Sequence, residues 1–366
     1  MRAKNLKNNS SPEFNFYIGL DVHKKSWSVT IRTVGLEVAH FTQKPNPSQL
    51  LGYLKKNFPE GQYFCAYEAG FSGTSLHFAL NNLGIQNIVV NAADIPQTNK
   101  QKNSKTDLHD SRSIAKYLEK GLLSGIHVLS IEQQEIRALF RCREATVKDT
   151  SRAINRLRSF LYFFGIEVPD VFKDKTYISK KFTTWLSTVK LSTSEGNESL
   201  KEYINQLHYH RNQVLLVTKQ LRKSILERFD ESFTCMLSVP GIGPVTAMGI
   251  LSETGDLNRF KNPDEYASYL GLIPAEHRSG EFTNMPTLQP RCNMHLRPLL
   301  VESAWFAIKQ CPTILAYYKK HAGKNSKKAI IKVARKIALI AKSVSINKTP
   351  YDSYYGILSN EKLCSN

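Results

Sequence analysis

Apolar residues in the first third of the chain follow the short patterns that are typical of β-strands. Two such runs, 16–21 and 26–31, are joined by a polar turn, and a third, 63–67, is followed by a glutamate. Residues 88–90 form a short continuous apolar run, which is typical of a strand buried on both faces. A helical pattern follows at 111–119. Strands followed by a helix in this way predict an α/β domain.

From about residue 131 the spacing of apolar positions changes to that of long helices. One stripe, 136–164, alternates steps of four and three, and a second stripe, 200–221, follows a polar section at 193–199. This heptad spacing predicts two helices that form an antiparallel coiled-coil hairpin, buried against each other or against another subunit. The arginines of the first helix face either nucleic-acid phosphates or solvent, namely Arg137, Arg141, Arg152, Arg156 and Arg158.

A glycine-rich turn, Pro-Gly-Ile-Gly-Pro at 240–244, lies between two apolar helical patterns. This arrangement is typical of a helix-hairpin-helix motif, in which Gly241 and Gly243 let backbone N–H groups approach a phosphate. Such a motif binds the nucleic-acid backbone without reading the sequence. A tight turn between helices without any ligand fits the same residues.

The last helical pattern, at about 326–345, combines an apolar face with a strongly basic one. Residues 319–348 include ten Lys or Arg and no Asp or Glu. Lys327 and Lys328, where this helix starts, are therefore candidates for binding nucleic acid. A face that only keeps the protein soluble is the alternative.

The chain of 366 residues is too long for one ordinary core, so several domains are expected. The patterns predict the following order: a disordered basic tail at 1–13, an α/β domain at 14–130, a coiled-coil hairpin at 131–232, a mainly α domain at 233–350 and a tail at 351–366.

The composition points to a polyanionic partner. Lys and Arg outnumber Asp and Glu by 50 to 31, giving a net charge of +19, and nucleic acid is the leading candidate. A membrane is not expected, because no stretch approaches about eighteen uninterrupted apolar residues. The six cysteines are scattered without a Cys-x-x-Cys pair, which is typical of reduced thiols in a cytoplasm.

Four carboxylates stand out in this basic chain. Asp21 and Glu68 each end a predicted strand, and Asp107 and Asp110 lie three residues apart at the start of a helix, where they share one face. If these groups converge, hard cations would relieve their mutual repulsion, and oxygen ligands favour Mg²⁺ or Mn²⁺. Two such ions about 4 Å apart stabilise both oxygens of an in-line phosphoryl displacement.

A simpler interpretation exists for most of these acids. Asp107 and Asp110 are residue types that the helix dipole favours in a first turn, and Glu68 is a possible surface residue at a strand end. Asp21 is harder to explain in this way, because a carboxylate directly after a buried strand needs a partner.

The motifs around these acids resemble the RuvC-like nuclease domain of DEDD insertion-sequence transposases of the "IS one-ten" type, which are relatives of the Piv DNA invertases. The similar N-terminal residues are Ile18-Gly19-Leu20-Asp21-Val22-His23-Lys24, Tyr67-Glu68, and Lys105-Thr106-Asp107 with Asp110-Ser111-Arg112. The C-terminal domain of that family is resembled by Leu237 to Ala247, Tyr269 to Pro274, Arg278-Ser279-Gly280, and Asn293 with Leu296-Arg297.

The resemblance implies an RNase H fold for the α/β domain, and a C-terminal transposase domain whose serine, here Ser279, is a nucleophile that joins to a DNA end. Asp21, Glu68, Asp107 and Asp110 would bind two Mg²⁺ ions in the same site. Arg278 and Arg297 are candidates for holding the phosphate. The family usually has Gly-Asn where this chain has Cys292-Asn293, which puts the local backbone in question.

The family further implies three kinds of partner. These are DNA, at the element ends and at the target, a structured non-coding guide RNA transcribed from the element, and other copies of the chain in a dimer or tetramer. The site would act in a prokaryotic cytoplasm, on the nucleoid. Whether one chain or two contribute to each site is left open by the sequence.

Two other functions compete with a transposase that uses Ser279. One is a metal-dependent DNA junction endonuclease, in which the four acids act alone with water as the nucleophile. The other is a nucleic-acid-binding protein without catalytic activity.

Overall fold

A computed structural model describes residues 14–96, 107–173, 179–274, 288–323 and 325–352 of the chain, without the side chains of residues 107–109 and 173. The chain divides into two compact units, Met1–Val128 and Leu129–Asn366. The predicted tail at 1–13 and all but two residues of the tail at 351–366 lie outside the described residues.

The first unit is built on a five-stranded mixed sheet with strand order β3-β2-β1-β4-β5. Strand β1 pairs antiparallel with β2 and parallel with β4. The four predicted strands are confirmed, whereas β3 was not anticipated from the apolar pattern. The strands are β1 Phe14–Val22, β2 Trp27–Thr33, β3 Leu36–Gln43, β4 Gly61–Glu68 and β5 Gln86–Val90.

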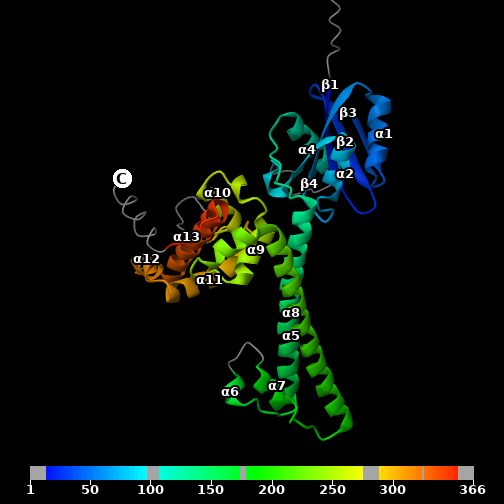
Figure 1. The fold of residues 1–366 in the computed structure, drawn as a ribbon. Helices are drawn as coiled ribbons and strands as arrows, with labels where there is room; N and C mark the ends of the chain where they lie inside the picture. Colours follow the sequence, from blue (N-terminus) through cyan, green and yellow to red (C-terminus); the bar gives the residue numbers. More distant parts are fainter. Residues whose placement is uncertain (1–13, 97–106, 174–178, 275–287, 324, 353–366) are drawn as a thin grey trace, which may run out of the picture. The chain divides into compact units, whose positions relative to one another are not determined.

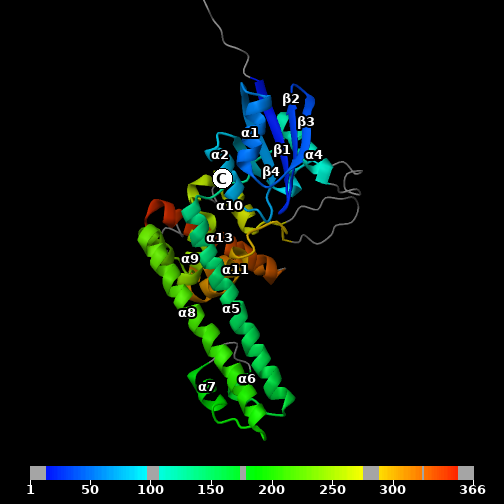
Figure 2. The same ribbon diagram turned by 90° about the vertical axis from the view of Figure 1, so that its right-hand side faces the viewer.

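Helices cover both faces of this sheet (Figures 1 and 2). Helices α1 (Pro47–Asn57) and α2 (Ser75–Asn82) pack on one face, where Leu20 of β1 is buried in the main core of the unit. Helix α4 (Asp107–Glu119) packs on the other face, beside the small residue Ala66 of β4. These layers confirm the predicted α/β architecture of the N-terminal part.

The second unit begins with two long helices that lie side by side and run in opposite directions (Figures 1 and 2). They are α5 (Ile131–Phe163) and α8 (Ser194–Leu237), and two short helices lie between them in the chain, α6 (Asp170–Lys173) and α7 (Lys180–Leu186). The two predicted helices are therefore present, and coiled-coil geometry stays a prediction. Helix α8 is much longer than its apolar stripe, with non-helical torsion angles at Phe229.

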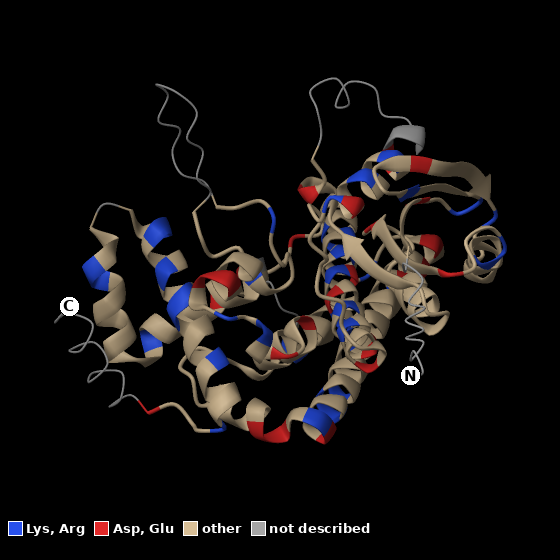
Figure 3. Ribbon diagram, turned by 90° about the horizontal axis from the view of Figure 1, so that it is seen from above, with Lys and Arg blue, Asp and Glu red and all other residues tan. Residues whose placement is uncertain are grey.

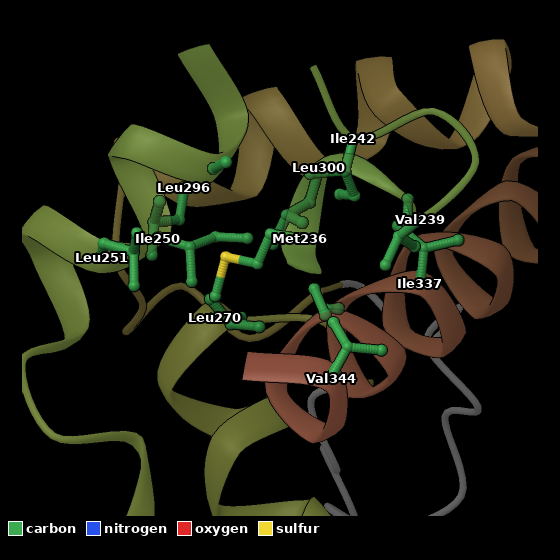
Figure 4. Close-up of a cluster of buried hydrophobic side chains, with 14 of the residues drawn as sticks. Met236, Val239, Ile242, Ile250, Leu251, Leu270, Leu296, Leu300, Ile337 and Val344 are labelled. Carbon is green, nitrogen blue, oxygen red and sulfur yellow. The ribbon is translucent and has the colours of Figure 1, made fainter. Parts of the chain in front are cut away.

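The remaining helices share one core with the ends of α5 and α8. Figure 4 shows Met236 of α8 among side chains such as Ile250, Leu296 and Ile337, which come from three later helices. The predicted helix at 326–345 is confirmed as α13. These helices are α9 Pro244–Thr254, α10 Pro263–Leu270, α11 Leu296–Gln310, α12 Pro312–Ala322 and α13 Ser326–Asn347.

A long apolar helix of the kind that crosses a bilayer is not found anywhere in the described part of the chain.

Candidate functional site

The sheet of the first unit brings two of the predicted carboxylates together at one edge. Strands β1 and β4 are parallel, and the pairing of Leu20 with Tyr67 puts Asp21 beside Glu68 at the carboxyl ends of both strands. Residues at matching positions of paired strands point to the same face of the sheet. The side chain of Asp21 is 17% exposed, and Glu68 is exposed. The two acids are thus accessible neighbours.

Helix α4 lies on the same face and begins at the same end. Near its last turn, Glu119 binds Arg32, which pairs with Tyr17 in the sheet, at the far end from Asp21. The helix therefore runs antiparallel to β1, and its first turn lies near the strand end.

The first turn of α4 is held near Asp21 by a hydroxyl contact. Ser111 lies 3.1 Å from Ser28 between their Oγ atoms, and Ser28 is the sheet partner of Asp21. Asp110, one residue before Ser111, is half-buried. Asp107 begins the helix, but its side chain lies outside the description. The described elements therefore carry Asp21, Glu68 and Asp110 to one end of one face.

Gly19 permits this close approach of helix and sheet. A Cβ atom at this position would lie 2.1 Å from the backbone oxygen of Ser111 and 2.5 Å from the backbone nitrogen of Ala115. Any other residue would push the helix away from β1 and away from the carboxylates. The glycine two residues before Asp21 therefore has a packing reason.

His23 is a neighbour of this site that the sequence reasoning passed over. Its Nε2 lies 3.1 Å from Oδ2 of Asp21, and the ring is largely exposed. His23 could have been predicted from its position two residues after Asp21, because residues i and i+2 of an extended chain lie on the same side. An imidazole there can orient the Asp21 carboxylate.

The chemistry of the donors fits a hard divalent cation, since three carboxylates from separate elements face one end of the sheet. Within the described ranges, no three His, Cys, Asp or Glu side chains are already grouped closely enough to hold a metal ion. Asp107, the fourth predicted ligand, has its side chain outside the described part of the chain.

The second unit contains a different acidic centre, which the sequence reasoning did not identify. Glu253 of α9 is fully buried, and both of its carboxylate oxygens accept hydrogen bonds from Arg141 of α5, at 2.7 and 2.9 Å. Arg137 forms a second ion pair with it at 3.3 Å. Its recognition requires the fold, because the partners lie more than 110 residues away in the chain.

Electrostatics keep this buried carboxylate ionised. Burial alone would raise the pKa of Glu253, but hydrogen bonds from Arg141 and Asn293 and the charges of Arg141 and Arg137 outweigh it. The pKa of Glu253 therefore lies below its ordinary value. Arg137 and Arg141, two of the arginines predicted to face phosphates or solvent, bind Glu253 inside the unit, and the side chain of Arg141 is also 46% exposed.

The Glu253 centre includes residues on both sides of the segment 275–287, which contains Ser279. Asn293 donates a hydrogen bond to Glu253 at 2.9 Å and another to the hydroxyl of Tyr269 at 3.0 Å. Tyr269 in turn donates its hydroxyl to the backbone oxygen of Glu253 at 2.6 Å. The side chain of Asn293 also accepts N–H bonds from the start of α11.

The residues on either side of the segment 275–287 are paired with each other. Pro274 and Leu288 form an antiparallel bridge, and the N–H of Gln289 donates to the oxygen of Ile273. Arg278 and Ser279, which belong to this segment, lie outside the described residues. The flanking residues are thus paired close in the chain to Tyr269 and Asn293, and Ser279 stays a prediction.

Arg297 has its described contacts within the protein. Its guanidinium donates to the backbone oxygen of Gln289 and lies close to Gly271. The neighbouring Cys292 does not have the left-handed backbone that would require glycine; the described non-glycine residues with positive φ are Val34 and Lys348. The presence of Cys292 where the family usually has glycine therefore does not disturb Asn293, whose side chain forms hydrogen bonds through both its nitrogen and its oxygen. That Arg297 binds a phosphate stays a prediction.

The glycine-rich turn combines a structural glycine with an open one. Gly241 has φ +82° and packs on α11, where a Cβ atom would lie 2.2 Å from the oxygen of Ser303. Its N–H donates to the side chain of Gln310 at 2.9 Å. Gly243 precedes α9 as its N-cap residue, and nothing would lie within 4 Å of a Cβ atom at this position. Beside the turn lies a groove of about 970 Å³, whose lining includes Lys148 of α5.

Lys and Arg recur over the C-terminal helices, coloured blue in Figure 3. Several are engaged within the protein: Lys342 donates to the backbone oxygen of Phe260, and Lys336 lies over the ring of Tyr317. Lys327 and Lys328 at the start of α13 are exposed. Their binding of nucleic acid stays a prediction.

Comparison with known proteins gives two family matches. Residues 18–165, from β1 to just beyond α5, match the family described as Transposase, the DEDD group of IS110. Residues 234–319, from the end of α8 into α12, match the family described as Transposase IS116/IS110/IS902 family. Both carboxylate strands and α4 fall in the first match, and Ser279 falls in the second.

Three curated bacterial relatives have similar sequences. A "Probable family 20 transposase" of Pseudomonas aeruginosa is 25% identical over 57% of this chain and 61% of its own length. The transposase for insertion sequence element IS1111A of Coxiella burnetii is 25% identical over 56% of this chain and 55% of its own. The transposase for insertion sequence element IS1533 of Leptospira borgpetersenii is 26% identical over 67% of this chain and 71% of its own length. The chain thus spans less than two thirds of the first two relatives.

Proposed function

We propose that this chain, which matches two transposase family models over separate parts of its length, is a transposase of the IS116/IS110/IS902 family that cuts and rejoins DNA at the ends of an insertion sequence. The observation that carries the proposal is the placement of Asp21, Glu68 and Asp110 at one end of the face covered by α4. Accessible carboxylates in a chain of net charge +19 are suited to a metal-dependent reaction on a polyanion.

In this proposal Asp21, Glu68, Asp107 and Asp110 hold two Mg²⁺ ions, or Mn²⁺ in their place. When bound, these ions neutralise the charge that develops on the reacting phosphate. His23 orients Asp21 through their contact at 3.1 Å. Gly19 keeps α4, and with it Asp110, against the sheet.

Ser279 is the proposed nucleophile. Its Oγ attacks a DNA phosphodiester, a new Oγ–P bond forms, the P–O bond to one strand breaks, and the serine proton passes to the leaving oxygen. The reverse attack by another DNA hydroxyl releases Ser279 and joins the strands, so the phosphoester bond is conserved throughout. The family resemblance of Arg278-Ser279-Gly280 supports this role, as does the pairing of Pro274 with Leu288 on either side of the segment that contains Ser279.

DNA and an element-encoded guide RNA are the proposed partners, together with further copies of the chain in a dimer or tetramer. The net charge and the exposed Lys327 and Lys328 support contacts to phosphates. The open Gly243 and the groove beside it support a backbone contact at the helix-hairpin-helix turn. Guide pairing would supply the sequence recognition, and the family resemblance supports it.

The decisive experiment looks for a covalent protein–DNA adduct. Wild type, Ser279→Ala and Asp21→Asn are incubated with element-end DNA, target DNA, the RNA transcribed from the element and Mg²⁺. Wild type should form a protease-sensitive adduct, and both variants should lose it. Ser151→Ala, an exposed serine on α5, is the matched control and should keep it.

The outcomes separate the competing functions. An adduct that persists in Ser279→Ala would exclude that serine as the nucleophile. Cleavage without any adduct in wild type, unchanged in Ser279→Ala, would favour a junction endonuclease that uses water. Binding without cleavage, unaffected by Asp21→Asn or by Mg²⁺, would favour a nucleic-acid-binding protein without catalysis.

A further inference from the structure

Three hydroxyl side chains form a buried cluster between the sheet and α4. The Oγ of Ser111 lies 3.1 Å from the Oγ of Ser28 and 2.9 Å from the Oγ1 of Thr30. Ser111 and Thr30 are fully buried, and Ser28 is 9% exposed. Buried hydroxyls cost stability unless they are hydrogen-bonded to one another, so their pairing constrains geometry.

The cluster joins the elements that carry the carboxylates. Ser111 directly follows Asp110 on α4, and Ser28 is the sheet partner of Asp21. Thr30 is the sheet partner of Gly19, the residue that lets the helix approach. The hydroxyl of Ser111 thus contacts β2 twice, at Ser28 beside Asp21 and at Thr30 beside Gly19.

A second directional contact at this end of the helix lies near the surface. Arg112 binds Glu37 of β3 with distances of 2.8 to 3.0 Å, but both side chains are about a third exposed, so this pair constrains the helix weakly. The strong pair between Glu119 and Arg32 lies at the other end. Apolar packing alone permits a helix to slide along a sheet, whereas hydrogen bonds have a fixed geometry.

We propose that Ser111, through Ser28 and Thr30, is a positioning residue for the metal-binding carboxylates. The inference rests on the proposed function, because it concerns the same metal site. Ser111 fixes the start of α4 relative to β1 and thereby sets the distance between Asp110 and Asp21. Residues that surround the metal ligands without binding the metal commonly orient those ligands.

His40 extends the cluster toward the surface. Its Nδ1 lies 2.9 Å from Oγ1 of Thr30. In Ser111→Ala, Thr30 therefore keeps His40 as a hydrogen-bond partner. Ser28 loses its contact with Ser111, so the substitution affects Ser28 more than Thr30. Ser111→Ala also keeps the helix intact, because alanine favours helix more than serine does.

The test measures Mn²⁺ binding to the full chain by electron paramagnetic resonance, with thermal unfolding as a parallel measurement. Ser111→Ala should weaken Mn²⁺ binding by about tenfold or more, the range typical of groups behind metal ligands. Thr30→Val should weaken it less. The double variant Ser111→Ala/Thr30→Val should bind like Ser111→Ala, because both substitutions remove the same link.

Ser303→Ala is the matched control. Ser303 of α11 is buried and lies 3.0 Å from the hydroxyl of Thr246, so this variant also breaks a buried Ser–Thr pair, but in the other unit. It should lower the unfolding temperature about as much as Ser111→Ala and leave Mn²⁺ affinity unchanged. A loss of stability alone therefore cannot imitate the expected result.

The outcomes distinguish this inference from the proposed function. If Asp21→Asn abolishes Mn²⁺ binding while Ser111→Ala binds as wild type does, the positioning role is overturned and the metal site stands. Equal weakening by Ser111→Ala and Ser303→Ala also overturns the positioning role. If wild type binds no Mn²⁺, or Asp21→Asn binds it unchanged, the metal site itself fails, and this inference with it.

Discussion

The two units of this protein treat their carboxylates in opposite ways. In the first unit Asp21 and Glu68 stand at the open end of a sheet, and Glu68 is exposed. In the second unit Glu253 is fully buried and receives two arginines and an asparagine. One arrangement leaves negative charge accessible, and the other neutralises it inside the fold.

The difference teaches how to separate a functional acid from a structural one. A buried carboxylate that already binds two guanidinium groups has no capacity for a cation, and its loss leaves unpaired positive charge behind. Acids grouped at an accessible edge repel one another, so they favour a cation. Accessibility and the partners of each acid decide its role, and the type of residue does not.

The largest expected effect comes from Glu68→Gln, which removes one charge at the open edge. It should reduce DNA strand cleavage by about 100-fold or more, because a metal ligand is lost. The free energy of unfolding should change by no more than about 0.5 kcal/mol, as for other exposed positions. Cleavage assays and urea unfolding measure the two quantities. Near-normal cleavage by this variant would remove Glu68 from the site.

The same substitution in the second unit should act on stability. Glu253→Gln should lower the free energy of unfolding by about 3 kcal/mol, because it leaves Arg137 and Arg141 without their counter-charge. Urea unfolding measures this change. Glu198→Gln, at an exposed position that pairs with Lys201, is the control and should cost at most about 0.5 kcal/mol. Equal effects at the two positions would contradict the structural role of Glu253.

The pH dependence of stability should reveal the same buried acid. The folded-state pKa of Glu253 is lowered, so its contribution is fully present above the ordinary value of 4.5 and is lost as the pH falls through the folded value. The stability difference between wild type and Glu253→Gln should therefore shrink on acidification below pH 4.5. Unfolding curves at several pH values provide the measurement, and a difference that stays constant would count against an ionised Glu253.

Gly19→Ala should damage the open edge through packing. The new Cβ would lie 2.1 Å from the backbone oxygen of Ser111, so α4 must shift, at a cost of about 1–3 kcal/mol. Mn²⁺ affinity should fall with it, because Asp110 moves away from Asp21. Gly52→Ala in α1 is the control, since nothing lies within 4 Å of its Cβ and alanine favours helix. Unchanged metal affinity in Gly19→Ala would separate the helix position from the site.

The smallest effect concerns charges that the second unit leaves exposed. Lys327→Ala/Lys328→Ala should leave stability unchanged and weaken DNA binding, reducing the slope of log affinity against log salt by about one per lost phosphate contact. Binding titrations at several salt concentrations measure the slope. Lys55→Ala/Lys56→Ala, an exposed pair in the last turn of α1, provides the matched control. An equal slope change in both double variants would show only a general effect of charge.

Much of the architecture was predictable because local patterns carry it. Alternating and continuous apolar runs predicted four of the five strands, and heptad spacing predicted α5 and α8. Strand β3 was missed although it contains apolar residues, because the alternation of Leu36 with Val38 shifts by one residue to Ala39 and Phe41, so no single alternating run covers the strand. The helix at 111–119 was predicted, but it begins earlier, at Asp107. Element ends depend on local capping more than on apolar spacing.

The sequence by itself determined that Asp21 and Glu68 end strands and that Asp110 opens a helix, because each assignment depends only on neighbouring residues. Tertiary structure decided that these ends meet, through the parallel register of β1 with β4 and the approach of Ser111 over Gly19. It alone revealed Glu253, whose arginine and asparagine partners are 40 or more residues away along the chain. Long-range partners, unlike periodicity, leave no signal in a single sequence, because they are selected by packing in three dimensions.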